Sequence, residues 1–178
     1  MYFFRTPLLA TALLSLMLST AHAGVIIGGT RIIFDGAKKE TSLSVNNPDG
    51  TPYLIQSWID VQEGASGKVP FIITPPLYRL DGGQKIVERI VMTGALPQDR
   101  ESLFWLNIKA IPSASTQMNA LQIAVKTRIK LIYRPAELHA STPDEQASQL
   151  RWRRTGNELQ VNNPTAYVIN FNEITLGG

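Results

Sequence analysis

The sequence predicts an all-β fold, because short segments of strand-forming residues recur along the chain and turn-forming residues separate them. Alternating apolar and polar residues are typical of a strand with one face on a core, while Gly, Pro, Asn and Asp are typical of chain reversals. The segments carry no convincing amphipathic helical pattern. About seven short strands in about 100 residues indicate an immunoglobulin-like β-sandwich, followed by an incomplete second β-sandwich domain.

The first domain is predicted to span residues 24–140. Its strands are expected at residues 30–34, 41–45, 53–61, 71–75, 85–93 and 102–111, and in a last segment from Leu121. Most of the connections, such as "NNPDGTP" and "RLDGG", supply the residues that favour turns. The expected strands therefore follow one another with short loops, as in a sandwich.

The last strand of this domain, residues 121–135, is unusually long. One face is predicted to carry Leu121, Ile123, Val125, Thr127, Ile129, Leu131 and Tyr133. A strand of this length is about twice the usual five to six residues, so part of its apolar row is expected to extend past the domain. From the pattern alone, the early part of the row can face either its own core or a partner.

The second unit, residues 141–178, begins with a polar linker. Three strands and a "TGN" turn are expected after it. A complete sandwich of this type uses about 100 residues, so this domain is predicted to be truncated. Its open edge and uncovered apolar rows would favour self-association.

Residues 1–23 have the features of a secretory signal peptide: the charged Arg5, an apolar run and "AHA" before Gly24. Cleavage is expected after Ala23. The apolar run is shorter than the roughly 20 residues of a membrane span, and no later segment is as apolar. The sequence therefore predicts an exported protein that is not inserted in a membrane.

Composition argues against several classes of function. The chain has no cysteine, and beyond the predicted signal peptide its one histidine is His139, so no zinc site or obvious general base is expected. The formal net charge of +3 is too small for a typical nucleic-acid-binding protein. No nucleophile-elbow, metalloprotease or phosphate-loop motif is present. We therefore predict a protein that is not an enzyme and has no metal or other cofactor.

Several stretches, in one order, carry a family resemblance: "TRIIFDG", "YLIQSWID", "ITPPLYRLDGGQ", "LPQDRESLFWLNIKAIP" and "LQIAVKTRIKLIYRP". With them the chain resembles the periplasmic PapD-like chaperones of the chaperone-usher pilus pathway. The resemblance covers residues 24–140 and continues through "VNNPTAYVINF". It implies a periplasmic chaperone that binds, folds and caps pilus subunits and works with an outer-membrane usher. It also implies a cis bond between Thr74 and Pro75.

The resemblance implies that the early part of the long strand, residues 121–135, faces a partner and not its own core. In this family that strand complements a pilus subunit whose own fold lacks a strand. The matching donor residues here are Leu121, Ile123 and Val125. Ile129, Leu131 and Tyr133, further along, are expected in the domain's own core.

Four charged residues also match family positions. Arg31 and Lys130 would bind the subunit's C-terminal carboxylate, as charge-assisted donors can. Glu101 and Arg134 would form an interdomain salt bridge with an acidic residue late in the second domain, a region absent here. Without the resemblance, Arg31 and Lys130 would be solvated strand charges by default, and Glu101 with Arg134 an ordinary exposed ion pair.

Two alternatives remain from the sequence. One is an inactive truncated remnant of such a chaperone. The other is an immunoglobulin-like structural subunit of the pilus. A subunit would carry its own N-terminal donor extension, whereas "GVIIGGTRIIF" runs straight into the first strand, which favours the chaperone.

Overall fold

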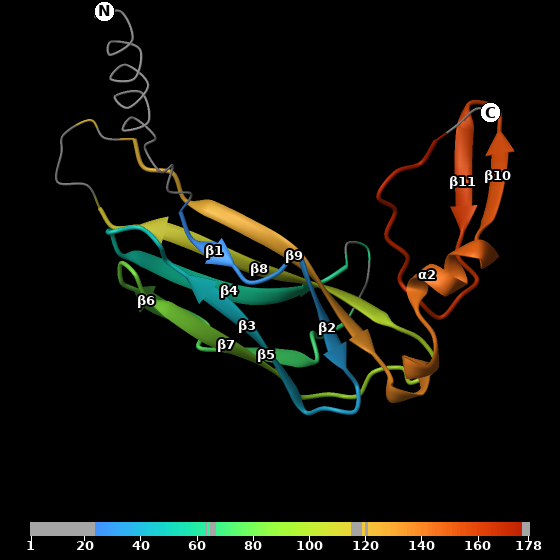
Figure 1. Ribbon diagram of the computed structural model, residues 1–178, viewed down its shortest axis with the longest axis horizontal. Coiled ribbons are helices and arrows are strands. Elements are labelled where there is room, and N and C mark those ends of the chain that lie inside the picture. The colour runs from blue at the N-terminus through green and yellow to red at the C-terminus, as the bar shows by residue number, and fades with distance from the viewer. Residues whose placement is uncertain (1–23, 63, 65–66, 115–118, 120, 176–178) are drawn as a thin grey trace, which may run out of the picture.

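The computed structural model describes residues 24–62, 64, 67–114, 119 and 121–175. The predicted signal peptide lies outside the described residues. Two sheets form the layers of a sandwich, and a two-stranded hairpin stands apart from them (Figure 1). The prediction of an all-β sandwich followed by a second β unit is confirmed.

The first sheet has four antiparallel strands. In spatial order they are β1 (Ile26–Ile27), β3 (Glu40–Asn46), β7 (Lys85–Met92) and β5 (Phe71–Thr74). The bond between Thr74 and Pro75, just after β5, is cis, as predicted.

The second sheet has five strands. In spatial order they are β2 (Arg31–Asp35), β9 (Val125–Arg134), β8 (Ser102–Pro112), β4 (Tyr53–Val61) and β6 (Leu77–Leu80). The β2–β9 pair is parallel, and the other pairs are antiparallel. A strand near the start of the sandwich domain, β2, therefore lies beside its last strand, β9.

The core lies between the sheets, where side chains at alternate strand positions meet. Fully buried members include Phe34, Val45, Ile55, Leu80, Ile90, Leu106 and Leu131. The Phe71 ring packs between two others, at centroid distances of 5.2 Å from Phe34 and 5.1 Å from Phe104. Alternation in the sequence thus corresponds to burial in the structure.

Three details of the strand prediction are wrong. The short strands β1 and β6 were not expected. The last strand begins at Val125, because residues 121–124 do not join the ladder with β8. The predicted third strand of the second unit is also absent, since no strand follows β11 among the residues described to 175.

Short helical turns join the sandwich to the hairpin: η1 (Ala136–Ala140), α2 (Pro143–Gln146) and η2 (Ala147–Gln149). Thr142 caps α2 in a capping box with Glu145, which accounts for a helical turn in the expected linker. The hairpin consists of β10 (Arg151–Thr155) and β11 (Glu158–Asn162), with Gly156 in the left-handed region at a φ of 61°. No helix of the described residues is long and apolar enough to cross a membrane.

Candidate functional site

The exposed apolar row lies at the start of β9 and just before it. The exposed fractions are 86% for Leu121, 67% for Ile123 and 58% for Val125, whereas Ile129 is only 6% exposed. The side chains of this row therefore change from exposed to buried between Val125 and Ile129. The expected burial of Ile129, Leu131 and Tyr133 in the domain's own core is confirmed.

The edge of β9 is open beside this row. β8 pairs with β9 from Val125 to Tyr133, but β2 pairs with it only from Lys130 to Arg134. On the β2 side, the part of β9 before Lys130 has no strand partner among the described residues. An unpaired strand edge next to exposed apolar side chains is a template for an added strand.

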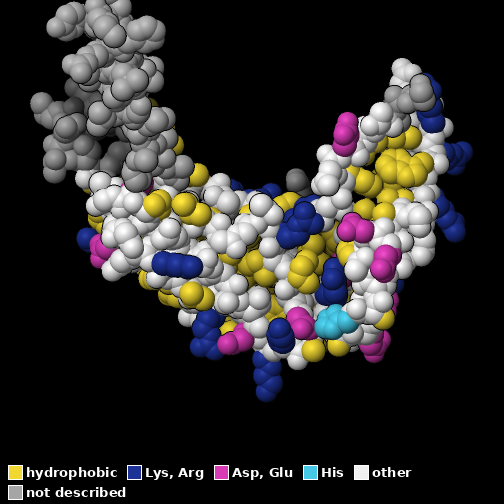
Figure 2. All heavy atoms as spheres, viewed as in Figure 1, with side chains coloured by type: hydrophobic (Ala, Val, Ile, Leu, Met, Phe, Trp, Pro, Cys, Tyr) yellow, Lys and Arg dark blue, Asp and Glu magenta, His cyan; other side chains and the backbone are white. Residues whose placement is uncertain are grey.

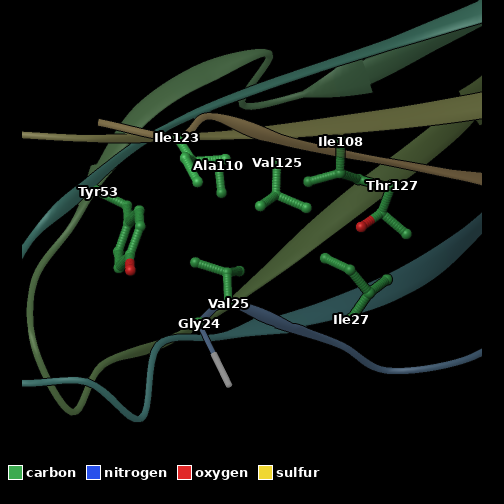
Figure 3. Close-up of a pocket in the computed structure, with 9 residues that line it drawn as sticks. All are labelled: Gly24, Val25, Ile27, Tyr53, Ile108, Ala110, Ile123, Val125 and Thr127. Carbon is green, nitrogen blue, oxygen red and sulfur yellow. The ribbon is translucent and has the colours of Figure 1, made fainter. Parts of the chain in front are cut away.

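A groove of about 170 Å³ runs along the same region (Figure 3). Ile123, Val125 and Thr127 lie on one side of it, and Val25 and Ile27 on the other. Ile108, Ala110, Tyr53 and Gly24 complete its lining. The groove is mostly apolar, so it can accept an apolar side chain next to the open edge.

Arg31 and Lys130 are direct partners in the parallel β2–β9 ladder. The structure thus brings together two cations that lie 99 positions apart in the sequence. No acidic side chain forms an ion pair with either of them within the described part of the chain. Two adjacent cations without an acidic partner can bind one carboxylate.

A cleft of about 270 Å³ surrounds this pair. It is lined by Thr30, Arg31, Trp105, Arg128, Ile129, Lys130 and Asn170. The Arg128 guanidinium carbon (Cζ) lies 4.4 Å from the centroid of the Trp105 ring, so this third cation stacks on the wall of the cleft. Asn170, which comes from beyond the hairpin, accepts a hydrogen bond from Lys130 Nζ.

Glu101 and Arg134 form an ion pair beside the hairpin arm, which comprises β10, β11 and the segment that follows them to residue 175. Arg134 Nε lies 2.5 Å from Glu101 Oε1, and the side chain of Glu101 is fully buried. The other carboxylate oxygen accepts a 2.7 Å hydrogen bond from the backbone N–H of Val168. The Glu101 N–H in turn donates to the carbonyl of Ala166 at 2.8 Å. This pair therefore fixes residues 166–168 against the sandwich through backbone groups.

Sequence reasoning missed Trp105, Arg128 and Asn170. The alternation of "KTRIKL" placed Arg128 and Lys130 on one face, but nothing in the sequence placed Trp105 or Asn170 beside them. No group of three or more His, Cys, Asp or Glu side chains that could hold a metal ion occurs in the described residues. The described site thus combines an open strand edge, an exposed apolar row and a cleft lined by three cations.

The comparisons with known proteins identify the family. Residues 24–139 match the family described as pili and flagellar-assembly chaperone, PapD N-terminal domain, and residues 145–178 match the PapD C-terminal domain of pili assembly chaperones. The chain belongs to the PapD family of pili-assembly chaperones. The family resemblance noted in the sequence is confirmed.

Relatives within the PapD family are fimbrial chaperones. The probable fimbrial chaperone LpfB of Escherichia coli O157:H7 is 52% identical over 167 residues, which cover 90% of this chain and 71% of LpfB. Chaperone protein FimC of Escherichia coli K12 is 46% identical over 164 residues, which cover 88% of this chain and 67% of FimC. Among solved structures, the Salmonella enterica SafA pilin in complex with the SafB chaperone matches with a TM-score of 0.79 and 39% identity. This match covers 90% of this chain and 77% of the matched chain in that complex.

Proposed function

We propose that the protein is a periplasmic chaperone that binds pilus subunits, completes their fold with β9 and caps them until assembly. The observation that carries this proposal is the exposed row of Leu121, Ile123 and Val125 beside an unpaired strand edge. The family, the fimbrial chaperones among the relatives and the likeness to a chaperone–pilin complex support it. We assign residues 24–140 to the subunit-binding domain and residues 141–178 to the linker and the start of the second domain.

An incomplete sandwich exposes groups that the apolar row and the open edge of β9 can cover. A subunit that lacks a strand exposes both apolar core and unpaired backbone groups. β9 supplies hydrogen-bond partners along its free edge, and its apolar side chains enter the groove of the subunit. This role needs no catalysis and no cofactor. We assign residues 1–23 to a cleaved signal peptide and propose an outer-membrane usher as the second partner.

Arg31 and Lys130 would bind the C-terminal carboxylate of the subunit and so fix the register of β9 against it. The two cations share one end of the β2–β9 ladder, where a chain end added beside β9 can reach both. Each charge-assisted hydrogen bond is expected to contribute about 1.5–3 kcal/mol. A ligand without a terminal charge would lose both contributions.

The carboxylate site can be tested with a short N-acetylated peptide of alternating valine and threonine, made as the free acid and as the amide. We expect the free acid to bind more tightly, and Arg31→Ala or Lys130→Ala to weaken its binding by roughly tenfold or more. The double variant should depart from the sum of the single losses, because both groups hold one carboxylate. Calorimetric titration measures the affinities.

Lys126→Ala is the matched control, since Lys126 is exposed on the same strand and does not line the cleft. It should leave the preference for the free acid unchanged. Equal binding of acid and amide by the unmutated protein would show that Arg31 and Lys130 are ordinary surface charges.

Self-association is a separate expectation and concerns the hairpin arm. Hydrophobic side chains gather on the surface of this arm (Figure 2). They include Trp152, Leu159, Val161, Phe171 and Ile174, all exposed by 37% to 50%. The Trp152 and Phe171 rings pack against each other in a tilted arrangement, with an interplanar angle of 54° and their centroids 5.5 Å apart. A contiguous exposed apolar patch favours contact with another chain.

The double variant Trp152→Ser with Phe171→Ser should therefore lower the self-association of the protein in sedimentation experiments. Leu54→Ser is the control, because Leu54 is exposed to a similar degree, 42%, but lies on the sandwich. A protein that is monomeric before any substitution would contradict this expectation.

A further inference from the structure

The cleft around Arg31 and Lys130, the carboxylate cleft, is also lined by a residue from outside the sandwich. Asn170 follows the hairpin and lies 40 positions after Lys130 in the sequence, yet it lines the same cleft as Arg31 and Lys130. Its position is set by the segment just before it. The Val168 N–H donates to Glu101 Oε2, and the Tyr167 hydroxyl donates to the carbonyl of Leu138 at 2.9 Å. Asn170 is thus held beside Lys130 by contacts that do not involve Lys130.

The orientation of the Asn170 amide follows from its partner. The ammonium group of Lys130 has three donors and no acceptor, so the atom that faces it must be the amide oxygen, Oδ1. The hydrogen bond uses one of the three ammonium donors and leaves two for a ligand. The amide nitrogen, Nδ2, carries two donors of its own and has no hydrogen-bond partner among the described residues.

We propose that Asn170 is the third member of the carboxylate site. Its Oδ1 holds the ammonium of Lys130 in position, and its Nδ2 donates to the carboxylate that Arg31 and Lys130 bind. The inference rests on the proposed function and adds to it, because the second unit of the chain takes part in recognising the end of the subunit. Ligand binding and the docking of residues 166–168 on the sandwich are then coupled.

The substitution Asn170→Asp tests this directly. It keeps the size of the side chain but places a fixed carboxylate on Lys130, which pairs with the cation before any ligand arrives and repels the ligand's carboxylate. We expect the preference of the protein for the free-acid peptide over the amide peptide to fall by roughly tenfold or more. Asn170→Ala removes the amide without adding a charge, so it should reduce the preference by a smaller factor.

Asn172→Asp is the matched control. It adds the same charge two positions further along, at an exposed residue that does not line the cleft. The preference for the free acid should be unchanged in this variant. Thermal melts of all three variants show whether any of them has lost its fold.

The possible outcomes distinguish the existence of the carboxylate site from the role of Asn170 in it. Equal binding of acid and amide by the unmutated protein overturns both the carboxylate site and the role of Asn170. A clear preference for the acid that Asn170→Asp and Asn172→Asp reduce equally overturns the role of Asn170 alone. If Asn170→Asp lowers the melting temperature strongly, the preference for the free acid is compared between Asn170→Ala and the unmutated protein instead. An unchanged or increased preference in that variant means that Asn170 is a spectator or a competitor of the ligand.

Discussion

Replacing Ile129 with Asp should unfold the sandwich, whereas the same change at Ile123 should leave it folded and remove subunit binding. Ile129 is 6% exposed and packs in the core, so a carboxylate there would be buried without a partner. We expect a loss of about 4 kcal/mol or more in the free energy of unfolding. Ile123 is 67% exposed, and Ile123→Asp should change that free energy by no more than about 0.5 kcal/mol.

The effect on binding should be the reverse of the effect on folding. In a complex, Ile123 would enter the apolar groove of the subunit, where an aspartate would bury an unpaired charge. Chemical denaturation measures the stability of each variant, and co-purification with a pilus subunit measures capture. Equal unfolding by the two substitutions would show that the whole row belongs to the chaperone's own core.

Alternation in the sequence predicts the strands well where one face is buried over a long run. Strand β4, Tyr53–Val61, has the predicted bounds for this reason. Strand β1 escaped prediction because it has two residues, too few to show a period. Strand β6 escaped prediction because it follows directly on Pro75 and Pro76, a pair that is typical of a turn.

The start of β9 was misplaced for a different reason. Residues 121–124 continue the alternation of β9, yet they have no ladder partner among the described residues. A row that serves a partner has the same period as a row that serves the domain's own core, so the sequence cannot separate the two. Burial separates them, and it changes between Val125 and Ile129.

The proposed carboxylate site was predictable only in part. Arg31 and Lys130 were found through the family resemblance, since a single cation in a strand carries no information about its use. Their adjacency follows from the parallel register of β2 and β9, which no local pattern encodes. Asn170 depends on how a distant segment docks against Glu101, and that is a property of the tertiary structure alone.

An acidic side chain without a cationic partner in the described part of the chain, Glu88 on β7, is fully buried in the sandwich. Its Oε1 accepts hydrogen bonds from Ser57 Oγ at 2.5 Å and from the Tyr78 hydroxyl at 2.9 Å, while Oε2 has no partner among the described residues. Burial raises the pKa of Glu88 above its ordinary value, although the two hydrogen bonds act in the opposite direction. The folded protein therefore keeps this carboxyl protonated to a higher pH than the unfolded chain does.

The contribution of Glu88 to the stability of the protein should accordingly fall as the pH rises above about 4.5, the ordinary pKa of a glutamic acid, and level off above the raised pKa of Glu88. Glu88→Gln keeps the shape and an acceptor for Ser57 and Tyr78 but cannot ionise. Its advantage over the unmutated protein should be small in acid and should grow by about 1.4 kcal/mol per pH unit across that interval. Denaturant unfolding at several pH values measures this difference, with the exposed Glu137→Gln as the control for a simple loss of charge.

A constant difference between Glu88→Gln and the unmutated protein from about pH 4 to about pH 8 would mean that Glu88 titrates alike in the folded and unfolded states. In that case the buried carboxyl would have to reach solvent in the native protein, because ionisation within the apolar core without a cationic partner is too costly to leave its pKa unchanged.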